Sequence, residues 1–113
     1  MQQQSIFTST HRVGLESLCA KLSERIGREV AIDYGTTDDN HFHDATFLLQ
    51  DGACDPLVTI IAVEGMNGPG FAVMAVDGSS VAHDVTFSVA LRSAQKAGAL
   101  CARRNRLMNW ATL

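Results

Sequence analysis

The chain has 113 residues, of which 46% are hydrophobic and 19% are charged, and its formal net charge is −3. This length fits one domain over residues 1–113, and this composition excludes a disordered chain. No apolar run reaches the roughly 18 residues of a membrane span, and the N-terminal segment lacks the features of a signal peptide. The three cysteines are far apart in sequence, which favours a reducing compartment. We therefore expect a soluble, cytoplasmic protein.

The first predicted element is a helix over residues 10–26. Leu15, Leu18, Leu22 and Ile26 recur at spacings of three and four, which places them on one stripe of a helix. Hydroxyl side chains at residues 8–10 can cap its start, and Gly27 can end it in a left-handed conformation. Residues 1–8 show no periodicity, and we expect them to form a frayed start.

Four strands are predicted next, at residues 30–34, 45–50, 57–64 and 71–76. Their short connections, which include a glycine-rich turn at 65–70, predict an antiparallel meander. The last two strands are apolar on both faces, so both faces need cover. Either one helix covers each face, or both helices share a face and a partner covers the other.

A second helix is predicted over residues 81–108, because Leu91, Ala94, Gly98 and Cys101 fall on one stripe. Ser80 would cap this helix and Asp84 would lie in its first turns. Alternation over 84–91 leaves a fifth strand there as the alternative. The predicted fold is therefore α+β: a four-stranded antiparallel meander, five-stranded in the alternative, flanked by an N-terminal and a long C-terminal helix. The predicted order is α-β-β-β-β-α.

The charges are unevenly distributed along the chain. Residues 29–91 carry ten carboxylates and no Lys or Arg, whereas residues 92–113 carry five cations and no carboxylate. One interpretation is ordinary solvation, because Asp is favoured in turns. The functional interpretation is a set of acidic loops that dock a protein with a basic surface, such as a nucleic-acid-binding protein. The loop residues assigned to this surface are Asp38, Asp39, Asp44, Asp51 and Asp55.

The second helix carries a basic stripe, for which we expect either solvation or contact with acidic groups of a second copy. The sequence pI is about 5.7, and no aromatic platform accompanies the stripe, so we expect no direct binding of nucleic acid. The stripe consists of Arg92, Lys96, Arg103 and Arg106.

Three short segments were considered as chemical sites. His41 and His43 have a spacing that metal sites use, and a metal-dependent enzyme or sensor built around them is the alternative function. No second pair of ligands supports that site, and we expect no metal and no cofactor. Cys54 lies between two aspartates, which disfavour its thiolate. The glycines of 65–70 lead into a strand and lack a Lys, so they predict a hairpin rather than a phosphate loop.

No catalytic motif was found, and the preferred function is a small non-enzymatic protein-binding module. Such a module acts as an inhibitor or adaptor, of the type that phages or mobile elements encode. In general character, a small acidic protein with a two-faced sheet resembles type III secretion chaperones and equally the inhibitors encoded by phages and plasmids. We also predict a homodimer, because isologous dimers commonly close an open apolar face. A self-associating structural subunit is the third alternative.

Overall fold

The computed structural model describes residues 6–36, 41–50, 56–66 and 68–111, with side chains described as far as Arg104. Its described elements form the order α-β-β-β-β-β-α, and the five strands make one antiparallel sheet in sequential order. The predicted α+β meander is therefore confirmed, in its five-stranded form. The elements are α1 (Ser9–Ile26), β1 (Val30–Thr36), β2 (Phe42–Leu49), β3 (Pro56–Gly65), β4 (Gly68–Ala75), β5 (Ser80–Val85) and α2 (Phe87–Ala111).

Helix α1 begins and ends where its capping residues predict. The Thr8 hydroxyl accepts a hydrogen bond from the His11 N–H at 3.3 Å, and the Thr8 N–H donates to the His11 Nδ1 at 3.1 Å. Gly27 ends the helix with a φ of 76°. The expected frayed start is wrong for residues 6–8, because Phe7 is buried and its N–H donates to the Phe42 carbonyl at 2.8 Å.

Helix α2 begins six residues later than predicted, because Ser80–Val85 forms strand β5 against β4. The prediction that Ser80 caps α2 and that Asp84 lies in its first turns is therefore wrong. Thr86 takes the capping role: its hydroxyl accepts from the Val89 N–H at 3.4 Å, and its carbonyl accepts from the Ala90 N–H at 2.9 Å. The alternative of a fifth strand was correct in kind, but the strand lies at 80–85 rather than 84–91.

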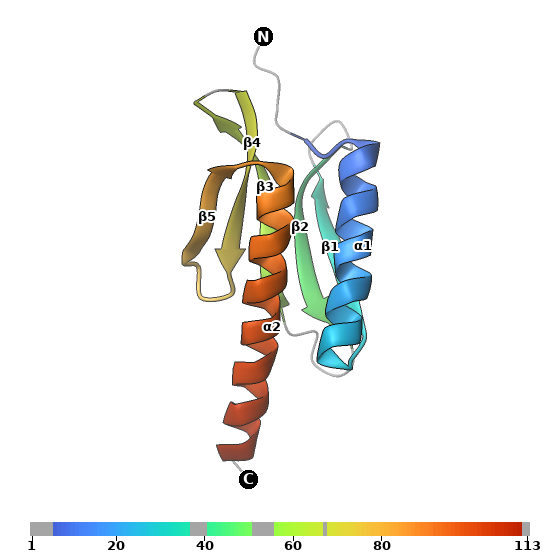
Figure 1. The fold of residues 1–113 in the computed structure, drawn as a ribbon, viewed down its shortest axis with the longest axis vertical. Helices are drawn as coiled ribbons and strands as arrows, with labels where there is room; N and C mark the ends of the chain where they lie inside the picture. The colour runs from blue at the N-terminus through green and yellow to red at the C-terminus, as the bar shows by residue number, and fades with distance from the viewer. Residues whose placement is uncertain (1–5, 37–40, 51–55, 67, 112–113) are drawn as a thin grey trace.

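Both helices lie side by side on one face of the sheet, α1 over the β1 side and α2 over β3 and β4 (Figure 1). A Cβ on Gly14 would meet the Phe87 ring, and a Cβ on Gly98 would meet Leu22 and Val58 at 3.3 Å. The two helices therefore approach each other and the sheet closely. The core lies between the two layers and is formed by residues such as Leu15, Leu22, Phe47, Ile60 and Ala94.

This arrangement decides between the two options left by the sequence: the helices share a face. The opposite face of the sheet, which we call the outer face, is not covered by α1 or α2 (Figure 1). Neither helix, over the residues described, combines the length and the apolar character needed to cross a membrane.

Candidate functional site

The outer face carries apolar side chains that do not belong to the core. Side chains two residues apart in a strand point to the same face, and register partners on neighbouring strands share that face. The register pairs Ala31 with Leu48, Ile61 with Ala72 and Val63 with Gly70, and it links these pairs across β2 and β3, so they lie on one side of the sheet. Ala72 is almost fully buried among its neighbours, whereas the larger side chains keep part of their surface exposed. The apolar residues of the outer face are Ala31, Leu48, Ile61, Val63, Ala72 and Met74.

A polar row crosses the middle of this face. Asp33, Thr46 and Thr59 are register partners on successive strands, and the apolar Met74 continues the row on β4. The Thr46 and Thr59 hydroxyls are hydrogen-bonded across the strands at 3.0 Å. Asp33 is exposed at the β1 end of the row, so a carboxylate lies at the edge of the apolar surface.

Asp84 adds a second carboxylate to the outer face, at the opposite edge of the sheet. Its backbone is left-handed, with a φ of 52°, and its carboxylate accepts a hydrogen bond from the Met66 N–H at 3.2 Å. A Cβ added to Gly65 or to Gly70 would collide with that carboxylate. The glycine-rich segment is thus a hairpin, as predicted, and two of its glycines make room for an internal carboxylate.

Asp44 was predicted in an acidic loop, but it lies within strand β2. Its carboxylate accepts from the Gly35 N–H at 3.0 Å and lies 3.1 Å from the His43 Nε2. A Cβ on Gly35 would overlap this carboxylate, so the bare backbone at Gly35 is what admits it. Asp44 therefore joins the outer face as a third carboxylate, half-buried and already hydrogen-bonded.

The other four predicted acidic residues, namely Asp38, Asp39, Asp51 and Asp55, lie outside the described residues. Their proposed role in binding a partner stays a prediction.

The His-x-His pair is at the start of β2. His43 has one ring nitrogen paired with Asp44, and its Nδ1 is enclosed without a hydrogen-bond partner in the described part of the chain. His41 precedes the strand and is exposed. Over the described ranges, no three His, Cys, Asp or Glu side chains gather in a group that could hold a metal ion.

Two cysteines, Cys19 and Cys101, pack against the core. Cys19 donates to the Val30 carbonyl at 3.0 Å, and burial together with the nearby Glu16 raises the pKa of its thiol. Cys101 donates to the Pro56 carbonyl at 3.7 Å. Cys54 lies outside the described residues.

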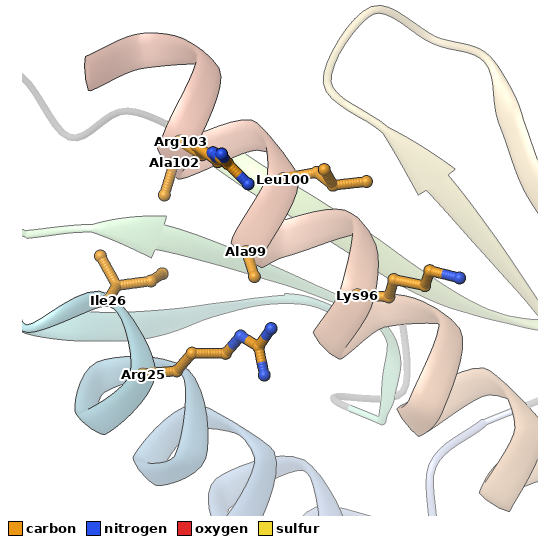
Figure 2. Close-up of a pocket in the computed structure, with 7 residues that line it drawn as sticks. All are labelled: Arg25, Ile26, Lys96, Ala99, Leu100, Ala102 and Arg103. Carbon is orange, nitrogen blue, oxygen red and sulfur yellow. The ribbon is translucent and has the colours of Figure 1, made fainter. Parts of the chain in front are cut away.

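The helix layer carries charge of the opposite sign. A cavity of about 410 Å³ lies between the end of α1 and the second half of α2. Figure 2 shows Arg25 pointing across toward Ala99. Lys96 and Arg103 also line it, and no carboxylate does. Of the predicted basic stripe, Lys96 and Arg103 thus meet at one cavity, while Arg92 is exposed elsewhere on α2. Arg106 lies in α2, but its side chain is not among those described.

A larger groove of about 600 Å³ lies on the other side of α2, against the β4–β5 hairpin. We call it the α2–β5 groove. Its apolar walls include Leu57, Ala75, Val76, Val81, Ala97 and Leu100. Its charged residues are Lys96 and Arg104 on the helix and Asp77 in the hairpin turn.

Asp77 is engaged within its own turn. Its carboxylate accepts from the Ser79 hydroxyl at 2.6 Å and from the Ser79 N–H at 2.9 Å. These bonds, with a smaller contribution from Arg104, hold the pKa of Asp77 below its ordinary value. The groove therefore presents two cations beside one ionised carboxylate that is already hydrogen-bonded.

Sequence reasoning missed this groove and its Arg104. A signal was present in Leu100, a large aliphatic residue on the opposite side of α2 from Gly98. A second signal was the pair Val76 and Val81, which flank the turn at 77–80. Neither feature indicates a groove until β5 is placed beside α2.

Comparison with known proteins adds no relative. The sequence matches no family model, and no curated protein or solved structure is significantly similar to it.

Proposed function

We propose that this protein is a non-enzymatic binding module whose outer face docks a partner protein with a basic surface. The observation that carries the proposal is the composition of that face. Ile61, Val63 and Met74 remain partly exposed there, and Asp33, Asp44 and Asp84 surround them. Every strand lies within residues 29–91, which contain no Lys or Arg.

Each part of this face has a separate physical role. Contiguous apolar surface gains free energy when it leaves water, in proportion to the area buried. The carboxylates steer a basic partner toward the face and fix its orientation, and they disfavour acidic competitors. The acidic loops predicted from the sequence would extend the same charge, since they connect strands of this sheet. An inhibitor or adaptor needs such a surface and no catalytic group.

The test is site-specific photo-crosslinking in the native host. A photo-crosslinking amino acid replaces Met74 on the outer face in one variant and Val13 in a matched control. Val13 is 67% exposed and lies on α1, in the opposite layer. We expect one partner to be captured from position 74 and not from position 13.

The captured partner is then purified and titrated against the wild type and against Asp33→Lys. Charge reversal at a docking surface should weaken binding by about tenfold or more, and the loss should shrink as salt is added. Equal capture from both positions, or equal affinity of both proteins at low salt, would count against the outer face. Capture of a second copy alone would favour the self-associating subunit.

A further inference from the structure

The α2–β5 groove is lined by a regular stripe of α2. The lining residues recur at helical spacing, from Ser93 through Lys96 and Ala97 to Leu100, Cys101 and Arg104. A stripe of this kind forms a ridge that can pack into the groove between ridges of a second helix. The opposite wall is formed by the β4–β5 hairpin, so the groove has a helix on one side and a sheet edge on the other.

Exposed aliphatic surface is concentrated in this groove. Val76, Val81 and Leu100 are 58%, 43% and 49% exposed, and all three line it. They are three of the five large hydrophobic residues exposed among the described side chains. Such a cluster marks an interaction surface more strongly than the same residues scattered singly would.

The helix layer leaves room for another helix at this place. Helix α1 lies over β1 and α2 packs over β3 and β4 and also contacts β5, which forms the far edge of the sheet without a further helix over it among the described residues (Figure 1). Helices pack at about 8 to 10 Å from one another, which spans roughly two strands of a sheet. A helix seated beside α2 would cover the β4–β5 hairpin and extend the layer.

We propose that the α2–β5 groove binds an amphipathic helix of a partner protein, with an apolar stripe bordered by Asp or Glu. The stripe would cover Val76, Val81 and Leu100, and the carboxylates would pair with Lys96 and Arg104. Asp77 is the one carboxylate among the lining residues, so the two cations leave the groove with a net positive charge. The groove lies in the opposite layer from the outer face, so this inference is independent of the proposed function.

The charge of this chain disfavours a second copy as the occupant. Residues 92–113 carry five cations and no carboxylate, so α2 of another copy would bring like charge to Lys96 and Arg104. Helix α1 carries three cations and two carboxylates and offers no acidic border. The groove therefore suits a different protein, bound by an apolar helix in a groove with complementary charge at its rim.

The experiment is a titration of isotope-labelled protein with a designed helical peptide that carries a leucine stripe bordered by glutamate. A matched peptide has lysine in place of every glutamate. We expect the acidic peptide to shift the backbone amides of residues 75–81 and 93–104, and to bind at least about tenfold tighter than the basic peptide. Its affinity should fall as ionic strength rises.

Two variants locate the site. Lys96→Glu with Arg104→Glu should weaken the acidic peptide by about tenfold or more, whereas the matched control Lys21→Glu with Arg92→Glu should leave it within about twofold. Leu100→Gln should also weaken it without any change of charge. Failure of the acidic peptide to bind, equal binding of both peptides, or equal losses in test and control variants would overturn the proposal. A concentration-dependent dimer that Leu100→Gln abolishes would overturn it in favour of a second copy.

Discussion

Among the described residues other than glycine, Asp84 alone has a positive φ. Few residues other than glycine adopt its positive φ, although Asp tolerates that region better than most. The conformation turns its carboxylate onto Gly65 and Gly70, where it accepts the Met66 N–H. The Asp84 carboxylate thus occupies the space that side chains at Gly65 and Gly70 would need, so these positions favour glycine as long as Asp84 keeps this conformation.

Substitution at Gly65 tests that unit. Gly65→Ala would place a methyl group where the Asp84 carboxylate lies, so the free energy of unfolding should fall by about 1 to 3 kcal/mol. Asp84→Gly removes the carboxylate, and in that background Gly65→Ala should cost much less. Chemical denaturation of the four proteins in this cycle measures the coupling. Additive costs would show that Gly65 is required for another reason.

His11 is both a capping residue and part of an aromatic cluster. Its Nδ1 accepts from the Thr8 N–H, and its ring lies 5.0 Å from that of Phe71 and 4.6 Å from that of Phe87. Burial lowers the pKa of His11 below its ordinary value of 6.5. A protonated Nδ1 could not accept the capping hydrogen bond, so the folded protein favours neutral His11.

Stability should therefore depend on the protonation of His11. A lowered folded pKa means that the unfolded state binds the proton first, so this contribution is complete above pH 6.5 and is lost as pH falls toward the folded pKa. Against His11→Gln, which keeps a possible acceptor but does not titrate, the wild type should lose more stability between about pH 7 and 5. Denaturation curves across that range measure the difference. Parallel pH profiles would exclude His11 as the titrating group.

At the scale of elements, α2 reaches the sheet closely because its inward side is small. Ala90 and Ala94 have no exposed surface, and Gly98 lies against Leu22 and Val58. Larger side chains on this stripe would push α2 away from β3 and from α1 at once. The outward side of the same helix keeps Leu100 and the cations in solvent.

Overpacking this stripe should be costly. Ala94→Leu should lower the free energy of unfolding by about 1 to 3 kcal/mol, because the added atoms have no space in a closely packed interface. The matched control is Ala20→Leu, at an exposed position of α1, with an expected effect within about 0.5 kcal/mol. Thermal or chemical denaturation compares the two. Equal effects would mean that α2 does not contact the sheet at Ala94.

The success of prediction differed between elements for physical reasons. Helix α1 carries its periodicity and both of its caps within the local sequence, and it was predicted within one residue at each end. Strand β5 is short, and the helical stripe of α2 continues formally into it from Phe87. Its pairing with β4, for example of Val85 with Phe71 and of Ala82 with Val73, makes that segment a strand, and this pairing depends on another part of the chain.

The binding surfaces were less predictable than the elements. The two apolar faces of the later strands left two arrangements open, because the sequence does not say on which side of the sheet the helices lie. Asp44 and Asp84 were interpreted as loop and helix residues, although both belong to strands. The α2–β5 groove depends on how α2 lies against the β4–β5 hairpin, which is a property of tertiary packing.

On the scale of the whole molecule, the two layers carry opposite charge. Residues 29–91, which include every strand, hold ten carboxylates and no Lys or Arg. Eight of the nine Lys and Arg residues fall within the bounds of α1 and α2, and the ninth, Arg28, lies two residues after the end of α1. The net charge of −3 conceals this polarity. A molecule of this kind can meet a basic partner on one layer and an acidic partner on the other, as an adaptor does.

The homodimer predicted from the sequence would bury the same outer face. Its salt dependence should be opposite to that of a complex with a basic partner. Stacking two outer faces brings carboxylates of like sign together, so such a dimer should strengthen as salt screens their repulsion. Light scattering at micromolar concentration would then approach twice 12.2 kDa at high salt. A complex with a basic partner should weaken under the same change. A mass near 12.2 kDa at every salt concentration would reject the dimer.

The central claim is that the uncovered outer face binds basic, apolar partners. The most direct measurement is a titration of isotope-labelled protein with a short peptide of alternating lysine and leucine, followed by the backbone amide signals. We expect shifts at outer-face residues, above all Ile61, Val63 and Met74, and an affinity that falls with salt. A matched glutamate–leucine peptide should give no response at these residues. Shifts confined to the helix layer, or equal responses to both peptides, would contradict the central claim.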